Sequence, residues 1–235
     1  MKTETKVTIG ILAATAIIIF GGITLYKGSV VPEGPKDYSK YVNTGLELDK
    51  IKVSRDYNPK ITGVSLSTST ASTTLIRVTE FLDYECPACA TNGEPLVKAL
   101  LLKYGSNIVV TRKIFPVHGQ ASVDVARVVL ASQILGSEVY QSIHTKVFET
   151  QQKWAVLGKK DREEYVKKLI VDMGVDYDKV FAESRDQKYV DQVTQDKQDA
   201  MDLGIKATPS FIIGNNTRIT GGLPFDEITK YIDTN

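Results

Sequence analysis

The stretch EFLDYECPAC, residues 80–89, decides the fold, because it holds both cysteines of the 235-residue chain, Cys86 and Cys89. The residues that lead into it, TLIRVTEFL at 74–82, are rich in β-branched and aromatic side chains, which is typical of a strand. The residues that follow, PACATNGEPLVKALLLKY at 87–104, indicate a helix. The two cysteines are therefore predicted to lie where a strand passes into a helix.

At such a junction the first sulfur lies at the helix N-terminus, where unpaired backbone N–H groups favour an anion. This lowers the pKa of the Cys86 thiol and makes it reactive. Cys89 lies on the same helical turn, so the pair can close a disulfide without backbone movement. The sequence therefore predicts a two-electron thiol–disulfide switch, with the redox-active disulfide Cys86–Cys89 in place of any bound cofactor.

Two other interpretations of the C-x-x-C are open. Half of a structural zinc site would need two more ligands, but there is no third cysteine, and His118 and His144 lack a paired-ligand spacing. We therefore predict no metal site. Two unrelated buried cysteines are the second alternative, against which Pro87 is a start signal for a helix.

Val7 to Tyr26, VTIGILAATAIIIFGGITLY, contains no charged residue. As a helix it would be about 30 Å long, which matches the hydrocarbon core of a bilayer. We predict a cytoplasmic N-terminus at 1–6 and a transmembrane anchor at 7–26. A cleaved signal peptide and a buried core helix are the alternatives; the run is longer than the usual apolar h-region of a signal peptide, and no A-x-A site follows it.

Residues 27–73 are predicted to be an extracytoplasmic linker, which is rich in Ser and Thr at its end. The run SLSTSTASTT at 65–74 buries little apolar surface. LELDKIKVSRDY at 46–57 alternates enough to be a short strand that joins the folded domain, although a plain linker throughout is equally compatible.

A single α/β domain is predicted at 74–235. A second strand at 107–117 follows the dithiol helix, which carries Pro95 and is expected to kink there. Hydrophobic periodicity and glycine stops then predict helices at 121–135, 137–154, 161–173, 176–184 and 186–203. Asp161 with Glu164 three residues later reads as a capping box at the third of these helices. Strands at 209–214 and 217–222 and a closing helix at 223–233 complete the order. This order predicts a four-stranded mixed sheet with helices on both faces and a helical insertion at about 119–204.

These segments resemble a DsbA-like thiol:disulfide oxidoreductase. The similarity rests on EFLDYECPAC, RKIFPVHGQAS, FETQQKW, GIKATPSFIIG and GGLPFDEI, which occur in the same order and at sensible spacings across residues 74–235. The resemblance implies a thioredoxin fold with an inserted helical domain, here preceded by one N-terminal transmembrane helix.

The resemblance also implies roles for individual residues. Cys86 matches the exposed nucleophile, and Cys89 matches the buried resolving cysteine. Pro209 matches a cis-proline that faces the dithiol, with an ordinary trans proline as the alternative. Thr208 is implied to bind substrate through its backbone, and we place Pro87 and Ala88 in the same substrate-binding group.

Glu80 matches the buried acid behind the dithiol. In apolar surroundings its pKa should rise, which would suit it to pass a proton to or from Cys89. A solvated strand carboxylate is the alternative. Asp83 and Tyr84 either shape the substrate surface or form the turn, and His118 is expected to cap a helix or pack rather than to act in catalysis. The aromatic residues Tyr140, Phe148 and Trp154 fall on helical spacings and are expected in the core.

The implied function is the introduction of disulfides into exported proteins by dithiol–disulfide exchange, on the extracytoplasmic side of the cell membrane. The resemblance implies a DsbB- or VKOR-like membrane protein as the re-oxidant. The dipeptide between the cysteines is Pro-Ala, without the histidine of the best-known members of the family, which should make the dithiol somewhat less oxidising than theirs. A disulfide reductase or isomerase and a non-catalytic membrane-tethered chaperone are the alternatives. The net charge of +1 gives no sign of a nucleic-acid partner.

Overall fold

The structure is a computed structural model that describes residues 51–52, 64–66, 75–214, 217–221 and 224–234, all within the unit Tyr38–Asn235. The predicted N-terminus at 1–6 and anchor at 7–26 lie outside the described residues, as does most of the predicted linker. Among the residues that are described, no helix is both long enough and apolar enough to cross a membrane.

The described strands form one six-stranded sheet in the order β1-β6-β5-β3-β4-β2. Their bounds are β1 Ile51–Lys52, β2 Val64–Leu66, β3 Ile76–Leu82, β4 Ile108–Ile114, β5 Ser210–Ile213 and β6 Thr217–Thr220. β3 and β4 are parallel, and the other pairs are antiparallel. The four central strands are the mixed sheet that the sequence predicts.

Of the two outer strands, β1 was expected and β2 was not. Both come from the range 27–73, which we predicted to be a linker, and they pair with the two edges of the sheet. The short strand predicted within 46–57 is confirmed by β1, whereas β2 overlaps the Ser/Thr-rich run, in which we expected no strand. The sheet therefore takes in residues before 74.

The helices follow the predicted order with small shifts at their ends. They are α2 (Glu94–Tyr104), α3 (Gln120–Ala131), α4 (Ser137–Glu149), α5 (Gln151–Trp154), α6 (Lys159–Asp172), α7 (Tyr177–Glu183), α8 (Gln187–Asp202) and α9 (Phe225–Thr234). Gly174 and Gly204 follow α6 and α8 with φ of 75° and 68°, a left-handed conformation that favours glycine and ends a helix. The helices α3 to α8 all fall in the chain between β4 and β5, within the range 119–204 that was predicted to be a helical insertion.

Two details of these helices differ from the prediction. Residues 87–104 are helical without a break and carry Pro95, as predicted, but Cys89–Gly93 form a π-helical turn directly ahead of α2. A proline ring clashes with the carbonyl four residues earlier, and the wider π register ahead of it avoids that clash. The capping box is wrong: α6 begins at Lys159 after Gly158, which places Asp161 inside the helix without a side-chain cap.

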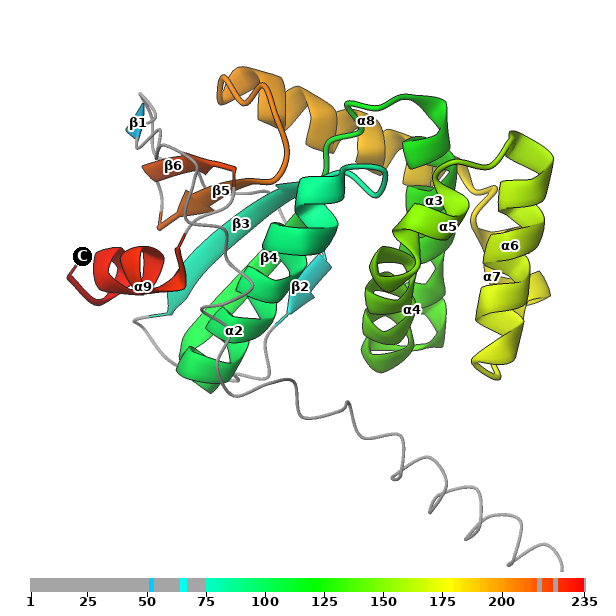
Figure 1. Cartoon of the computed structure of the whole chain (residues 1–235), viewed down its shortest axis with the longest axis horizontal. Coiled ribbons are helices and arrows are strands. Elements are labelled where there is room, and N and C mark those ends of the chain that lie inside the picture. Colours follow the sequence, from blue (N-terminus) through cyan, green and yellow to red (C-terminus); the bar gives the residue numbers. More distant parts are fainter. Residues whose placement is uncertain (1–50, 53–63, 67–74, 215–216, 222–223, 235) are drawn as a thin grey trace, which may run out of the picture. The chain divides into compact units, whose positions relative to one another are not determined.

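The two faces of the sheet are covered by different helices (Figure 1). Successive side chains of a strand point to opposite faces. Val78 of β3 packs in one cluster with residues of α2 and α9, whereas Phe81 packs in another with Ala200 and Leu203 at the end of α8. The end of α8 therefore lies beside the face opposite to α2.

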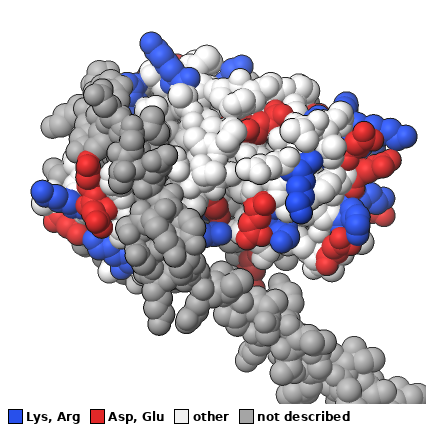
Figure 2. Space-filling view, viewed as in Figure 1, with Lys and Arg blue, Asp and Glu red and all other residues white. Residues whose placement is uncertain are grey.

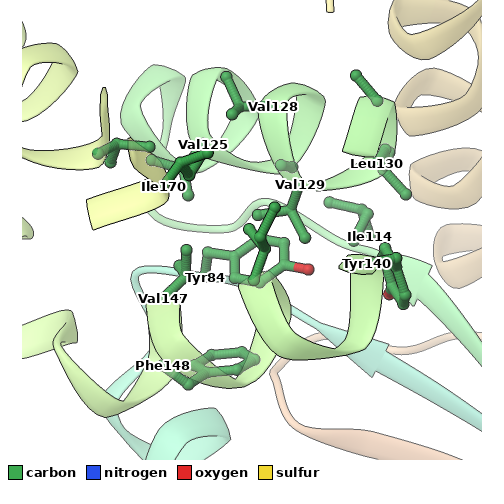
Figure 3. Close-up of a cluster of buried hydrophobic side chains, with 14 of the residues drawn as sticks. Tyr84, Ile114, Val125, Val128, Val129, Leu130, Tyr140, Val147, Phe148 and Ile170 are labelled. Carbon is green, nitrogen blue, oxygen red and sulfur yellow. The ribbon is translucent and has the colours of Figure 1, made fainter. Parts of the chain in front are cut away.

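A third hydrophobic cluster fills the insertion and reaches the dithiol. It includes Tyr84, Cys86 and Cys89 together with apolar side chains of α3, α4, α6 and α7. Figure 3 shows Tyr84 surrounded by side chains of this cluster, with Phe148 nearby. The predicted core positions Tyr140, Phe148 and Trp154 are all buried. The core of the insertion thus forms one wall of the cysteine site.

Candidate active site

Cys86 and Cys89 sit at the strand-to-helix junction, as predicted. After β3 the backbone turns, with the Cys86 N–H donating to the Asp83 carbonyl at 3.1 Å, and the Cys89 N–H then donates to the Cys86 carbonyl at 3.1 Å. Both cysteines are free thiols here. Both are buried, Cys86 at 5% exposure and Cys89 at 0%, so Cys86 is not the exposed sulfur that the resemblance implies, although it is the less enclosed of the two.

The surroundings of the two sulfurs move their pKa values in opposite directions. A hydrogen bond from Cys89 is the largest influence on Cys86 and, with the backbone N–H groups of Ala88 and Cys89, it lowers the pKa of Cys86 to about 6 against the opposing effect of burial. Burial raises the pKa of Cys89 well above its ordinary value of 9.0, and the negative charges of Cys86 and Glu80 add to this. At neutral pH the pair is therefore one thiolate and one thiol.

The Thr208–Pro209 peptide bond is cis, as the resemblance implies. The Cys86 thiol donates to the Thr208 carbonyl at 3.2 Å, so this loop faces the dithiol. The Thr208 hydroxyl oxygen is buried with no hydrogen-bond partner among the described residues. When Cys86 is ionised its sulfur becomes an acceptor, and the hydroxyl then contributes to the lowered pKa of Cys86.

Gly93 lets the dithiol helix approach two other site residues. A Cβ atom at this position would lie 3.0 Å from Glu80 Oε1 and 3.2 Å from Pro209 Cβ, both closer than side chains ordinarily pack. The Glu80 carboxylate, Pro209 and the first turns of the helix are therefore held against one another.

Glu80 is 1% exposed, so the alternative of a solvated strand carboxylate is wrong. Burial raises its pKa to about 7, with the negative charge of Glu94 adding and the Arg112 guanidinium opposing. The Arg112 Nε atom lies 3.3 Å from Glu80 Oε2. A carboxyl group that titrates near neutral pH beside Cys89 is able to exchange a proton with it; that role stays a prediction.

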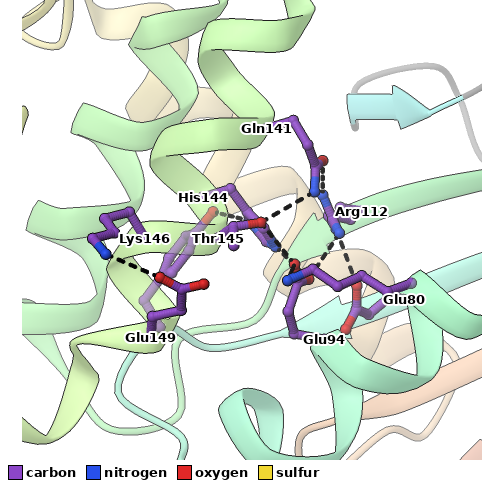
Figure 4. A network of polar contacts seen from close by, with 10 residues as sticks. Glu80, Glu94, Arg112, Gln141, His144, Thr145, Lys146 and Glu149 are labelled. Atoms are coloured by element: carbon purple, nitrogen blue, oxygen red, sulfur yellow. Dashed lines mark hydrogen bonds and ion pairs between the residues drawn. The ribbon is translucent and has the colours of Figure 1, made fainter. Parts of the chain in front are cut away.

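Figure 4 shows the polar network behind Glu80. Arg112 pairs with Glu80 across the parallel strands β3 and β4. Its Nη2 atom also lies 2.9 Å from Glu94 Oε2 of α2. Glu94 in turn contacts His144 Nε2 of α4 at 2.9 Å, and His144 Nδ1 contacts the Tyr84 hydroxyl at 2.8 Å. One cation is thus shared between two buried carboxylates.

The two buried carboxyl groups, Glu80 and Glu94, differ in their protonation. Burial works against ionisation of Glu94, but the groups of His144 and Arg112 outweigh it and hold the Glu94 pKa well below its usual range. Burial and the Arg112 charge lower the pKa of His144 to about 4, so His144 is neutral at pH 7 and acts on Glu94 as a hydrogen-bond donor through Nε2. Glu94 therefore carries the negative charge that balances Arg112, and Glu80 is left to hold the proton.

The sequence analysis missed Arg112, Glu94 and Gln151. Gln151 of α5 donates through Nε2 to the Tyr84 and Cys86 carbonyls, at 2.7 and 2.8 Å, and so ties the insertion to the cysteine turn. A charged residue inside an apolar strand is the signal that could have found Arg112. Nothing local marks Gln151, because its partners are backbone atoms more than 60 positions away.

The predicted substrate-binding residues differ in exposure. Pro87 is exposed and Ala88 is half-buried, whereas Thr208 is largely buried and faces Cys86. Asp83 and Tyr84 are fully buried, so the prediction that they shape the substrate surface is wrong, and their place is in the turn and the core. Within the described ranges no group of three or more His, Cys, Asp or Glu side chains is placed to hold a metal ion.

On the face shown in Figure 2, no large area carries charges of only one sign. Figure 2 shows Lys and Arg interspersed with Asp and Glu around the helices at its right, and a stretch of uncharged side chains in the middle of the view. A cavity of about 200 Å³ lies in the insertion between α3, α6 and α7, and none of its lining residues belongs to the dithiol turn.

Comparison with known proteins identifies the family of the chain. The family model for thioredoxin matches residues 68–234. The chain belongs to the thioredoxin family. No curated protein matches it.

Several solved structures have a similar fold. The thiol-disulfide exchange protein alpha-DsbA2 of Wolbachia pipientis is 22% identical over 74% of this chain and 87% of that chain, with a TM-score of 0.63. Oxidised BdbD of Bacillus subtilis is 19% identical over 78% and 97%, with a TM-score of 0.63. The catalytic domain of Proteus mirabilis ScsC is 17% identical over 74% and 89%, with a TM-score of 0.58. At these identities the likeness establishes only the thioredoxin-like fold. The structures that share this fold include a thiol-disulfide exchange protein.

Proposed function

We propose that this thioredoxin-family chain is a thiol:disulfide oxidoreductase that introduces disulfides into exported proteins through Cys86 and Cys89. The observation that carries the proposal is the opposite shift of the two sulfurs, since Cys86 has a pKa of about 6 and the pKa of Cys89 lies well above 9.0. A low pKa makes Cys86 a good leaving group, which is the property that an oxidant of substrate thiols needs.

The reaction has two exchange steps. A substrate thiolate attacks Cys86 Sγ of the oxidised protein, the Cys86–Cys89 bond breaks, and the Cys89 sulfur leaves with the electron pair and takes a proton from Glu80. A second substrate thiolate then attacks the substrate sulfur of the mixed disulfide, and Cys86 leaves with the electron pair as a thiolate. The substrate has lost two electrons, and the protein has become the dithiol.

Substrate binding is assigned to the surface beside Cys86. Pro87 and Ala88 border the sulfur on the helix, and the backbone of Thr208 offers groups that an extended substrate segment can pair with. Pro209 holds this loop against the dithiol. No cofactor is proposed beyond the Cys86–Cys89 disulfide itself.

The location and partners belong to the same proposal. The uncharged run at 7–26 supports a single-pass anchor that keeps the catalytic domain on the extracytoplasmic side of the cell membrane, where disulfides persist. There the reduced protein would pass two electrons to a DsbB- or VKOR-like membrane re-oxidant, whose local concentration the anchor raises. Cysteine-containing exported proteins are the proposed substrates.

A reductase or isomerase on the same fold is the second candidate. It is favoured by one feature, the Pro-Ala dipeptide between the cysteines, which lacks the histidine that would add positive charge there. The two candidates share all the residues of the site and differ in the direction of electron flow.

The deciding experiment is the reduction potential of the Cys86–Cys89 pair in the full chain, which is kept in detergent because of the run 7–26, by equilibration with glutathione. A reduction potential of about −120 mV, that of a strong oxidant, supports the role of disulfide donor. A potential of about −270 mV, that of thioredoxin, would make the protein a reductase. Cys86→Ser must abolish exchange, and Cys89→Ser must accumulate the mixed disulfide. Exchange that survives Cys86→Ser would contradict both candidates.

A further inference from the structure

Asp83 holds the loop that follows β4, at the same edge of the sheet, because the parallel strands β3 and β4 end side by side at Leu82 and Ile114. It directly follows β3 and is fully buried, and its Oδ2 atom accepts from the backbone N–H groups of Val117 and His118 at 2.7 and 2.9 Å. The same oxygen lies 2.8 Å from His118 Nδ1. Its Oδ1 atom accepts from the Glu85 N–H at 2.8 Å and from the Ser122 hydroxyl. Asp83 therefore fixes both the backbone and the ring of His118.

This contact determines which nitrogen of His118 is free. Since Nδ1 faces the Asp83 carboxylate, Nδ1 carries a hydrogen and Nε2 is the nitrogen that gains or loses a proton. The side chain of His118 is 43% exposed, so Nε2 has access to solvent. From the sequence His118 was expected to cap a helix or pack, whereas in the structure its ring pairs with the buried Asp83 carboxylate.

The same aspartate also holds the nucleophile. Its main-chain carbonyl accepts from the Cys86 N–H at 3.1 Å, so Cys86 and the His118 ring are bound to opposite ends of one residue. The electrostatics agree with this proximity. Burial of His118 lowers its pKa, but the Asp83 hydrogen bond and the negative charges of Asp83, Cys86 and Glu85 outweigh burial and raise it above 6.5.

We propose that His118, oriented by Asp83, is the electrostatic partner of the Cys86 thiolate and supplies from the β4–α3 loop the positive charge that the Pro-Ala dipeptide does not provide. Cys86 gains negative charge when it leaves the mixed disulfide, and a neighbouring imidazolium stabilises that charge. Asp83 is the positioning residue. The inference rests on the proposed function, because it assumes that Cys86 is the exchanging sulfur.

The pairing operates in a defined pH window. The Cys86 thiolate forms above about pH 6, and the imidazolium persists up to the raised pKa of His118, so both charges coexist between these values. Above that window His118 is neutral and the stabilisation of the thiolate is lost. The hydrogen bonds from Cys89 and Ala88 remain the larger influences on Cys86, so His118 adds a smaller, pH-dependent part.

The first test uses no mutation. The pKa of His118 is measured by NMR titration of the full chain in its dithiol and disulfide forms. Since coupling between two charges is reciprocal, the thiolate must raise the pKa of His118 in the dithiol form, and Cys86→Ser must remove that rise. The other histidine, His144, is buried in the Glu94 network and serves as a reference in the same spectra. Equal His118 pKa values in the two forms would overturn the inference.

The second test measures Cys86 itself. We expect His118→Gln, whose amide can still donate to Asp83, to raise the pH at which Cys86 is alkylated by iodoacetamide. It should also shift the glutathione equilibrium two- to tenfold toward the disulfide of the protein, where tenfold corresponds to about 30 mV. His118→Lys, which restores a positive charge, should recover most of the loss. The exposed neighbour Gln120→Ala is the matched control and should change neither quantity.

The outcomes separate this inference from the proposed function. If the wild-type chain catalyses exchange but His118→Gln behaves like Gln120→Ala, only the role of His118 is refuted. If His118→Gln and His118→Lys lower activity equally without moving the alkylation profile of Cys86, the ring is structural and the inference is likewise refuted. If the wild type shows no exchange at all, the proposed function has failed.

Discussion

Replacing Glu80 by glutamine should stabilise the protein at alkaline pH while slowing its exchange reaction. Glutamine has nearly the size and shape of a protonated glutamate but cannot ionise. Glu80 is 1% exposed and shares the single Arg112 guanidinium with Glu94, whose charge already balances that cation. Ionising Glu80 therefore puts an excess negative charge into the core, and Glu80→Gln prevents this.

The magnitude follows from the pKa of Glu80. An unfolded glutamate ionises near 4.5, and in the folded state the pKa is about 7. Because the folded pKa is the higher one, the folded state binds the proton more tightly, and stability falls as pH rises from 4.5 to 7. The difference of about 2.5 pKa units, at ~1.36 kcal/mol per unit, corresponds to about 3 kcal/mol. Glu80→Gln should thus equal the wild type near pH 4.5 and exceed it by up to about 3 kcal/mol at pH 8.

The assay is urea unfolding of the reduced chain at both pH values. The fluorescence of Trp154, the single tryptophan and a fully buried one, reports the transition. Other groups also titrate between these pH values, but they contribute equally to Glu80→Gln and wild type and cancel in the difference. The rate of mixed-disulfide formation with a substrate thiol is measured on the oxidised forms of the same two proteins, where the variant should be slower because the departing Cys89 has lost its proton donor.

Two results would refute this reasoning. A stability difference between Glu80→Gln and wild type that does not change between pH 4.5 and pH 8 would show that Glu80 does not titrate in that range. An unchanged exchange rate in a variant with the expected gain in stability would show that Glu80 is a buried acid without a role in proton transfer to Cys89.

Two further substitutions test the packing and the hydrogen bonds of the site. Gly93→Ala should lose ~1–2 kcal/mol in urea unfolding, because its Cβ would crowd Glu80 and Pro209, whereas an uncrowded helical glycine would gain up to ~1 kcal/mol from alanine. A gain would show that the approach at Gly93 is looser than 3.0 Å. Thr208→Val should raise the pH at which iodoacetamide alkylates Cys86, since it removes the hydroxyl that helps to lower the pKa of that thiol, and it should leave stability unchanged or higher because the hydroxyl is buried without a partner. An unchanged alkylation profile would mean that Thr208 acts on Cys86 through its backbone alone.

The centre of the fold was predictable because its signals are local. A β-branched strand, two cysteines at helical spacing and a run of periodic helices ending in glycines fix the order of elements without knowledge of contacts. The burial of Glu80 was expected from the resemblance, whereas the strand pattern alone left a solvated carboxylate open. The edge strand β2 was missed because a Ser/Thr-rich run carries no apolar pattern, and its pairing with Val110–Arg112 is a property of the sheet.

The polar partners were missed for a different reason. Arg112 faces Glu80 only because β3 and β4 are parallel in one particular register, and a shift of one residue would have put Lys113 there instead. His118 and Asp83 are 35 positions apart and meet because both follow neighbouring strands. Spacing along the chain cannot specify such contacts, whereas the sheet determines them completely.

The register also explains how the single strand β4 forms ion pairs on both faces of the sheet. Arg112 points to the α2 side and balances Glu94, while the next residue, Lys113, is fully buried on the other side and contacts Asp196 and Asp199 of α8 at 2.9 and 2.7 Å. Adjacent positions of β4 thereby tie the sheet to the helix that carries the dithiol and to the helix that closes the insertion.

The distribution of polar groups around the dithiol then accounts for the difference between its sulfurs. On the inner side Cys89 meets apolar side chains and Glu80, which disfavour an anion, so an electron pair arriving there must be accompanied by a proton. On the outer side Cys86 meets N–H groups and a hydroxyl, which favour an anion without a proton. A helix that presents one sulfur to each environment therefore separates the two leaving groups of the exchange reaction: Cys89 departs as a thiol and Cys86 as a thiolate. Because only the outer sulfur leaves as an anion, pH should act on the two exchange steps through different residues.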